Sequence, residues 1–167
     1  MKHPTIGAVF ALLALVSTCP SLAQEVDAAR ERTIKDEVNS FIDQYTQWFQ
    51  QDRPDLIAER VYLSPSVRVT PTGPAVMASV DSIRRTWEGI LEPLLADGYE
   101  RSEWSTRHIC VLNESAALVS GHFVRYRKDG SVIGEYGATY TLVKANDGWR
   151  IITVITHSTT RVLRCTK

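Results

Sequence analysis

Apolar residues recur at spacings of three and four between positions 28 and 51, separated by charged and amide side chains. This spacing puts them on one face of a helix. The pattern therefore predicts a long amphipathic helix with a strongly aromatic buried face, made of Ile34, Val38, Phe41, Ile42, Tyr45, Trp48 and Phe49.

Two shorter helices and a hairpin are predicted next. Pro54 is expected to open a short helix that runs to Val61, because proline is tolerated in a first turn. The stretch SVRVTPTG alternates Val67 and Val69 before a Pro-Thr-Gly turn, which predicts a small hairpin. Ser79, with Ser82 three residues later, is expected to cap a third helix that ends by residue 97.

The rest of the chain reads as strands. Four runs rich in β-branched and aromatic residues are joined by short segments of Asn, Asp, Gly and Ser, which form tight turns. Short turns make consecutive strands antiparallel neighbours, so we expect a four-stranded meander over residues 103–112, 116–127, 132–144 and 149–157. The pattern predicts an α+β fold, with three N-terminal helices covering one face of a curved sheet.

The first 23 residues have the form of a secretory signal peptide. Lys2 precedes an apolar stretch too short to span a bilayer, and Ser21-Leu22-Ala23 offers small residues for cleavage after Ala23. An alternative interpretation takes residues 16–19 as a lipoprotein box that anchors the chain at Cys19, but Thr18 is bulky for the position before the cysteine. We expect a secreted or periplasmic protein with one domain over residues 24–160 and a tail over residues 161–167.

Charge and composition narrow the range of partners. Cleavage would remove one lysine and no acidic residue, which leaves the mature chain with a net charge of about −1 and no basic patch. Nucleic acid is therefore not an expected partner. After the signal segment no long apolar run predicts a membrane span. Three mature histidines on three different strands, with no carboxylates at ligand spacing, predict no metal site, and no cofactor fingerprint is present.

The chain resembles the nuclear transport factor 2-like superfamily, in its SnoaL-like and ketosteroid-isomerase-like branch. The resemblance lies in FIDQYTQWFQQDRPDLI, in VRVTPTG and in the closing YRKDGSVIGEYGATYTLVKANDGWRIITVITH, and it covers residues 36–157. It implies a cone in which three helices roof a bent sheet, mixed or antiparallel, around a deep apolar pocket. It does not imply one chemistry, because the same fold carries many functions.

The resemblance to ketosteroid isomerases is incomplete at the catalytic positions. Tyr45 matches their oxyanion-binding tyrosine, but Thr70 stands where they have a carboxylate base, and a threonine hydroxyl does not remove a proton from carbon at neutral pH. No acid in GATYTLV matches their second oxyanion donor. The isomerase mechanism is therefore not expected, and Tyr45 is also consistent with a simple core position.

The turn at Asp129-Gly130 sets the faces of the two strands that it joins. A two-residue turn pairs Phe123 with Tyr136, and this register places His122 and Glu135 as neighbours on the opposite face. Arg125 is a further polar candidate for the cavity. The aromatic and polar residues that we expect to bind a ligand are Tyr45, Trp48, Trp87, His122, Tyr136, Tyr140 and His157.

The last strand leaves two questions open. Its turn, Asn146-Asp147-Gly148, allows two or three residues, and the choice reverses which side chains face the pocket. His157 is then either a residue at the pocket mouth or a strand end bonded to the following polar run. Both sets of side chains on this strand are largely apolar, so we expect one face to meet the helices and the other a second copy, in a homodimer.

Cys110 and Cys165 are the cysteines that remain after cleavage, in a compartment that allows disulfides. An extended tail after His157 reaches about 25 Å, enough to cross a four-stranded meander. We expect a disulfide between them that holds the tail. Three functions stay open: a binder of a small, mostly apolar ligand in the aromatic cavity, an isomerase, dehydratase or hydrolase with another catalytic set, and an interaction module with a filled cavity.

Overall fold

The computed structural model describes residues 26–165. The predicted signal peptide and the alternative anchor at Cys19 lie outside the described residues. Within residues 26–165 no helix has both the length and the apolar character needed to cross a membrane. The helical elements are α1 (Ala28–Gln50), α2 (Pro54–Leu56), η1 (Ile57–Val61) and α3 (Val80–Ala96). The strands are β1 (Tyr62–Thr70), β2 (Gly73–Met77), β3 (Tyr99–Asn113), β4 (Ala116–Arg127), β5 (Val132–Ala145) and β6 (Gly148–His157).

Capping side chains mark the starts of both long helices. The Asp27 carboxylate accepts hydrogen bonds from the backbone N–H groups of Ala29 and Arg30, both at 2.9 Å. The predicted cap at the start of α3 is confirmed, because Ser79 and Ser82 each accept a bond from the other's backbone N–H. These bonds satisfy N–H groups that have no partner within a helix.

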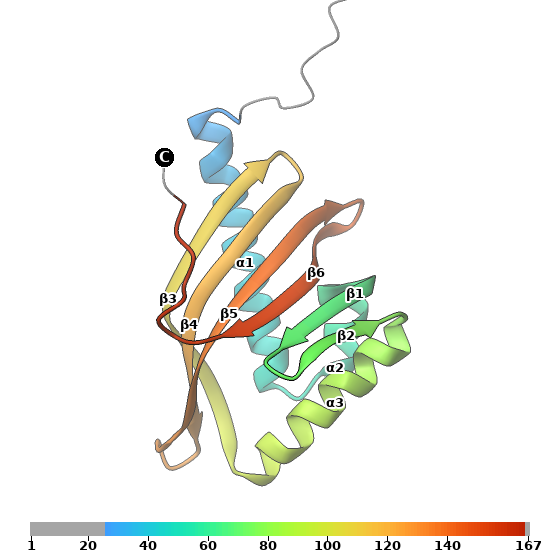
Figure 1. Cartoon of the computed structure of the whole chain (residues 1–167), viewed down its shortest axis with the longest axis vertical. Coiled ribbons are helices and arrows are strands. Elements are labelled where there is room, and N and C mark those ends of the chain that lie inside the picture. The colour runs from blue at the N-terminus through green and yellow to red at the C-terminus, as the bar shows by residue number, and fades with distance from the viewer. Residues whose placement is uncertain (1–25, 166–167) are drawn as a thin grey trace, which may run out of the picture.

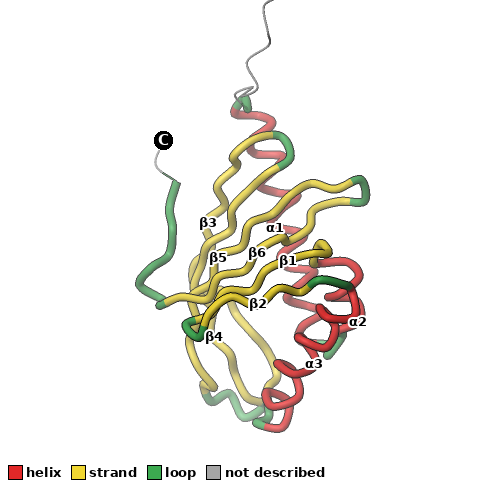
Figure 2. The backbone as a smooth tube through the Cα atoms, turned by 45° about the vertical axis from the view of Figure 1, so that its right-hand side comes forward, coloured by secondary structure: helices red, strands yellow, loops and turns green. Residues whose placement is uncertain are grey.

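The sheet has six strands in the order β2-β1-β6-β5-β4-β3. Every pair is antiparallel except β1 and β6, which run parallel. Figures 1 and 2 show α1 lying across one face of the curved sheet, with α3 alongside the β1–β2 hairpin. The predicted α+β fold with a curved, helix-covered sheet is confirmed, and the parallel pair of β1 and β6 makes the sheet mixed. We call the face toward α1 and α3 the inner face, and the opposite one the outer face.

The largest difference from the predicted strand limits is at the start of β3. Strand β3 begins at Tyr99 rather than at residue 103. Gly98 has a φ of +80°, which lets the chain turn directly from the end of α3 into the strand. The four additional residues matter for the site, because they extend β3 along the inner face to Ser102.

The pairing of β4 with β5 follows the predicted register. Phe123 pairs with Tyr136, and Gly121 with Ala138. The turn before β6 has two residues, because Ala145 pairs with Gly148. The register then shifts by one residue, because Leu142 pairs with Ile151 but Thr141 pairs with Thr153, and this β-bulge directs Val154 and Thr156 to the inner face and His157 to the outer face.

The tail after β6 crosses the outer face toward β3 (Figure 1). The Leu163 N–H donates to Ser120 Oγ at 2.9 Å, which ties the tail to β4. Cys165 then forms a disulfide with Cys110 of β3, and their Cα atoms lie 5.7 Å apart. The structure thus brings the predicted cysteine pair together, and the bond is typical of a protein of an oxidising compartment.

Candidate functional site

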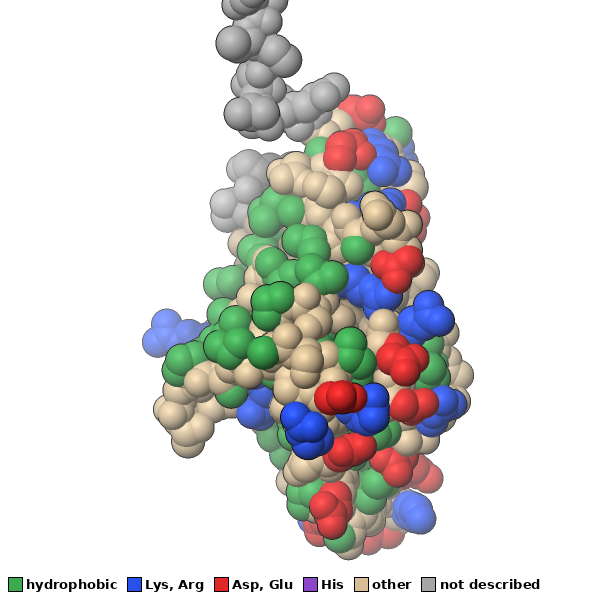
Figure 3. All heavy atoms as spheres, turned by 90° about the vertical axis from the view of Figure 1, so that its right-hand side faces the viewer, with side chains coloured by type: hydrophobic (Ala, Val, Ile, Leu, Met, Phe, Trp, Pro, Cys, Tyr) green, Lys and Arg blue, Asp and Glu red, His purple; other side chains and the backbone are tan. Residues whose placement is uncertain are grey.

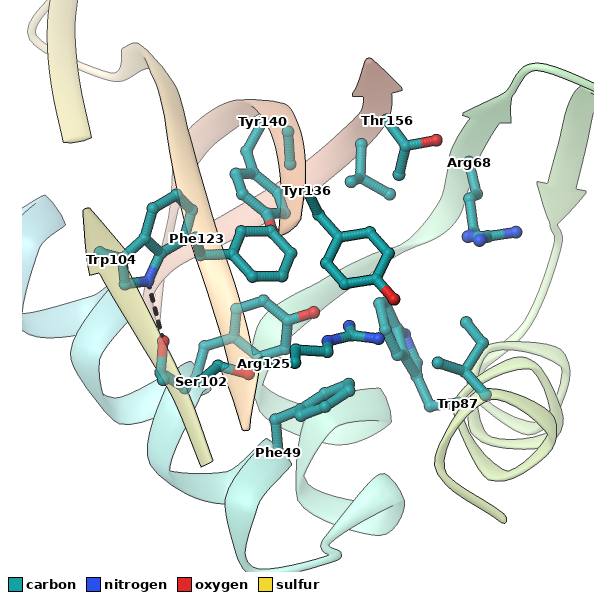
Figure 4. Close-up of a pocket in the computed structure, with 15 residues that line it drawn as sticks. Phe49, Arg68, Trp87, Ser102, Trp104, Phe123, Arg125, Tyr136, Tyr140 and Thr156 are labelled. Carbon is teal, nitrogen blue, oxygen red and sulfur yellow. Dashed lines mark hydrogen bonds between the residues drawn. The ribbon is translucent and has the colours of Figure 1, made fainter. Parts of the chain in front are cut away.

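A cavity of about 130 Å³ lies between α1, α3 and the inner face of the sheet. Figure 4 shows its side chains converging from opposite walls. Seven elements contribute, so the site depends on the whole tertiary fold. The lining residues are Tyr45, Thr46, Phe49, Arg68, Trp87, Ile90, Ser102, Trp104, Phe123, Arg125, Tyr136, Ala138, Tyr140, Val154 and Thr156.

Aromatic rings form the closed end of the cavity. Tyr45 is 6% exposed, and its ring packs edge-on against Trp87 at 5.9 Å and Tyr140 at 6.2 Å between centroids. Phe49 packs against Trp87 in the same way, also at 5.9 Å. Edge-to-face contacts of this kind hold each ring in place. The cavity therefore has a rigid apolar floor.

The wall formed by β3 depends on a glycine. The Trp104 ring lies against Phe123, with centroids 5.2 Å apart, and its Nε1–H donates to Thr46 Oγ1 at 3.3 Å. A Cβ atom on Gly121 would lie only 2.6 Å from the Trp104 ring. Gly121 therefore allows the indole to lie directly on strand β4.

Arg125 projects from β4 into this aromatic cavity. Its guanidinium carbon lies 4.8 Å from the centre of the Tyr136 ring, 4.9 Å from that of Phe49 and 5.5 Å from that of Phe123. Such cation–π contacts contribute about 0.5–2 kcal/mol each, depending on desolvation. The rings stabilise the guanidinium group but accept no conventional hydrogen bond from it.

No described carboxylate pairs with Arg125. Its Nε atom is buried without a hydrogen-bond acceptor among residues 26–165. A second arginine, Arg68 of β1, lines the same cavity, and it too forms no ion pair with a described residue. The lining includes no aspartate or glutamate. The cavity therefore holds two positive charges and no negative one.

Burial keeps the cavity tyrosines protonated. It raises the pKa of Tyr140 to about 12, although the nearby positive charge of Arg125 acts in the opposite direction. Burial likewise raises the pKa of Tyr45 well above its usual value. Both phenols are therefore neutral at physiological pH, and they are able to donate hydrogen bonds to a ligand oxygen.

The structure brings four of the seven predicted ligand-binding residues together in this lining: Tyr45, Trp87, Tyr136 and Tyr140. It places Trp48, His122 and His157 elsewhere. Trp48 of α1 is partly buried against the core and lies outside the cavity lining. The two histidines point to the outer face, whereas Tyr136 and Tyr140 of the same sheet point into the cavity, because alternate residues of a strand point to opposite faces.

His122 and His157 have partners of their own. His122 Nε2 lies 3.1 Å from Glu135 Oε2, as expected from the register, on the face opposite Phe123 and Tyr136. His157 Nε2 lies 2.9 Å from Thr139 Oγ1, and its Nδ1 lies 2.8 Å from the Ser158 carbonyl oxygen. The geometry of His157 therefore matches a strand end bonded to the polar run that follows it.

Thr70, which stands where ketosteroid isomerases have their carboxylate base, forms only local contacts. Thr70 Oγ1 lies 2.7 Å from Thr72 Oγ1, within the β1–β2 turn, and it is outside the cavity lining. The lining contains no histidine, aspartate, glutamate or lysine that would act as a base. Among the described residues, no group of three or more His, Cys, Asp or Glu side chains is placed to hold a metal ion.

Three lining residues, Phe49, Trp104 and Phe123, were expected in the core or in strands but were not assigned to the site. The sequence pattern does not indicate a cavity position for Arg68, because its strand reads as a hairpin at the edge of the fold. The alternation in VRVT is the sequence feature that could have indicated it, because this alternation places the Arg68 side chain on the face of the strand opposite to that of Val67 and Val69. The prediction lacked the parallel pairing of β1 with β6, which brings Arg68 level with Val154.

Comparison with known proteins agrees with this fold. The family model described as NTF2-like protein (DUF6841) matches residues 34–159. The comparison with curated proteins found no match.

Solved structures share the fold at low sequence identity. An NTF2-like protein with a cystatin-like fold from Novosphingobium aromaticivorans has 18% identity and a TM-score of 0.63, over 77% of this chain and 85% of that one. Aln2 from a Streptomyces species has 14% identity and a TM-score of 0.64, over 75% and 90%. A protein from Catenulispora acidiphila, solved in complex with S-DNPA, has 18% identity and a TM-score of 0.59, over 75% and 94%. Because the family model spans most of the chain, this protein belongs to the NTF2-like family DUF6841.

Proposed function

We propose that this protein is exported and binds a small, mostly apolar ligand in the cavity between α1, α3 and the sheet. The observation that carries the proposal is the lining itself, which is largely aromatic and contains no candidate base. An apolar cavity of about 150 Å³ holds one benzene molecule. A volume of about 130 Å³ therefore suits a single ring or a short branched chain inside the cavity.

Two observations favour binding over the alternatives. An enzyme of the isomerase or dehydratase type needs a group that accepts a proton from carbon, and the polar side-chain groups of the lining are hydroxyls, indole N–H groups and guanidinium groups. An interaction module with a filled cavity would leave no such volume. The related fold from Catenulispora acidiphila was solved in complex with S-DNPA, which supports a binding role for folds of this kind.

A thermal-shift screen with apolar acids, sterols and polyketides tests the proposal. Thr156 lines the cavity, whereas Thr153 of the same strand points to the outer face. A ligand that raises the melting temperature should lose its effect in Thr156→Trp, which fills the mouth of the cavity, and keep it in the matched control Thr153→Trp. Equal responses of both variants would place binding elsewhere.

Export is part of the same proposal. It is supported by the charged, apolar and small-residue succession of residues 1–23 and by the disulfide between Cys110 and Cys165. Mass spectrometry of the secreted or periplasmic fraction should find a chain that starts near Gln24. A chain with an intact N-terminal segment in that fraction would contradict cleavage after Ala23.

A further inference from the structure

Two arginines without acidic partners are an unusual lining for an apolar cavity. Removing a guanidinium group from water costs free energy unless an anion or several acceptors replace the water. The rings of Phe49, Phe123 and Tyr136 surround the Arg125 guanidinium but leave its hydrogen-bond donors unused. Its Nε atom in particular is buried without an acceptor. The cavity therefore carries positive charge that no described acidic side chain balances.

We propose that the ligand is a monocarboxylic acid with one ring, whose carboxylate binds Arg125. This inference rests on the proposed function and names the chemical class of its ligand. A guanidinium group presents its N–H donors in a planar fork that matches the two oxygens of a carboxylate. In Figure 4 the side chain of Arg125 runs between the rings of Phe49 and Tyr136 and points into the cavity. Its position leaves the fork available to an anion inside the cavity.

The charges in the cavity favour one negative charge on the ligand. Of the two arginines in the cavity, Arg125 is the one whose Nε is buried without an acceptor, and a single carboxylate neutralises it. Arg68 comes from β1 on the opposite wall. Its side chain, like that of Arg125, is partly buried, but none of its nitrogens is a described buried atom without a partner, so water solvates that second charge and it needs no second anion. We assign to Arg68 the role of attracting the acid toward the mouth of the cavity.

The apolar part of the ligand follows from the remaining walls. Tyr45, Trp87 and Tyr140 are each about 5% exposed and form the closed end of the cavity. A planar ring fits beside them, because aromatic rings stack or pack edge-on with little loss of conformational freedom. The neutral phenols of Tyr45 and Tyr140 would accommodate a polar substituent on that ring.

Calorimetric titration of the purified protein with phenylacetate and phenylacetamide tests the inference, since the two compounds have nearly the same shape and differ in charge. We expect phenylacetate to bind about 10- to 100-fold more tightly, the range of one charge-assisted interaction. Equal binding of the two compounds would overturn the carboxylate inference but leave the ligand-binding function standing. Binding of neither compound at about 10 mM would count against both.

Variants locate the effect on one residue. Arg125→Gln should weaken phenylacetate binding by about 10-fold or more and change phenylacetamide binding by less than about threefold. Arg101→Gln is the matched control: Arg101 also lies over an aromatic ring, that of Tyr126 at 4.5 Å, but it is paired with Glu100 and Glu103 outside the cavity. It should leave both affinities unchanged. If Arg125→Gln binds phenylacetate as tightly as the parent protein, the assignment of Arg125 is wrong.

The comparison of the two ligands on the parent protein does not depend on any variant. A folding defect in Arg125→Gln, detected by near-ultraviolet circular dichroism, would therefore leave the first test intact. Arg125→Lys then provides the second variant, because it keeps the charge and loses the fork. We expect it to retain a preference for the acid that is weaker than that of the parent protein.

Discussion

Thr139 Oγ1 lies 2.9 Å from His157 Nε2 on the outer face of the sheet. The contact continues in both directions, since Thr139 Oγ1 lies 2.7 Å from Ser120 Oγ and His157 Nδ1 lies 2.8 Å from the Ser158 carbonyl oxygen. Ser120 Oγ in turn accepts the N–H of Leu163. A neutral imidazole with its proton on Nδ1 allows each group in this chain to donate to the next. The chain of bonds joins three strands to the tail.

Removing the central hydroxyl should loosen the tail without affecting the cavity. Thr139→Val keeps the shape of the side chain but leaves Ser120 and His157 without their shared partner. We expect a loss of about 1–3 kcal/mol in the free energy of unfolding, together with faster proteolysis after residue 157. Thr141→Val on the same strand is the control, because no described hydrogen bond involves its hydroxyl. A loss of ligand affinity in Thr139→Val alone would instead connect His157 with the binding site.

The disulfide between Cys110 and Cys165 closes a segment of 55 residues. In the chain-entropy model a loop of this length stabilises the fold by up to about 4 kcal/mol. Cys165→Ser should lower the unfolding free energy by less than that amount, because the freed tail is able to detach while the sheet stays folded. Unreduced protein, unfolded for thiol counting, should contain no free thiol at these two positions; two free thiols per mature chain would refute the bond.

Gly121 should not tolerate a side chain. An alanine Cβ there would lie 2.3 Å from the Thr106 carbonyl oxygen and 2.6 and 2.8 Å from ring atoms of Trp104, so both the β3 backbone and the indole in the cavity wall would have to move. We expect Gly121→Ala to destabilise the protein by about 1–3 kcal/mol, to alter the tryptophan fluorescence and to weaken ligand binding. Gly89→Ala in α3 meets nothing within 4 Å and should stabilise the protein slightly. Similar effects of the two substitutions would contradict the close approach of Trp104 to β4.

Stability should fall in acid partly through Glu37. Its carboxylate accepts hydrogen bonds from Lys144 Nζ at 2.6 Å and Trp149 Nε1 at 2.9 Å, and these bonds lower its pKa below the usual 4.5. A lowered pKa in the folded state means that the contribution is fully present above about pH 4.5 and is lost as the pH falls through the folded value. Urea unfolding of Glu37→Gln as a function of pH should show a shallower acid limb than that of the parent protein.

The outer face should form a homodimer. Apolar side chains on β1, β2 and β6 share this face, because Val67 pairs with Val76 and Val69 lies level with Ile155. Val76 is 69% exposed and Ile155 is 39% exposed. Figure 3 shows hydrophobic side chains gathered along one edge of the molecule, consistent with such a patch.

Light scattering measures the mass. The protein should be a dimer at tens of micromolar, and Val76→Lys should shift it toward the monomer by placing a charge in the interface. Leu112→Lys, at the far edge of the sheet, is a control of similar exposure. A monomer mass for the unmodified protein would refute the prediction.

Local patterns in the sequence were sufficient for the elements and for part of the register. The spacing from Ile34 to Phe49 and the pair Ser79 and Ser82 predicted α1 and the cap of α3, because helix periodicity and capping involve neighbours within one or two turns. The Asp129-Gly130 turn predicted the pairing of Phe123 with Tyr136, because a short turn leaves few registers open. The resemblance to the superfamily supplied the remaining topology.

The inner face of β6 and the charge of the cavity depended on contacts far apart in the chain. The register of β6 against β5 shifts by one residue between Ile151 and Thr153, and without this β-bulge the two-residue turn at Asn146-Asp147 would put His157 on the inner face. Arg68 reaches the cavity because β1 pairs in parallel with β6, a strand that begins almost 80 positions after the end of β1. The absence of an acidic partner for Arg125 among the described residues likewise depends on the seven elements that line the cavity. The sequence by itself determined the helices, the strands and the presence of Arg125. Only the tertiary structure decided that the Arg125 side chain lies among aromatic rings and has no described acidic partner.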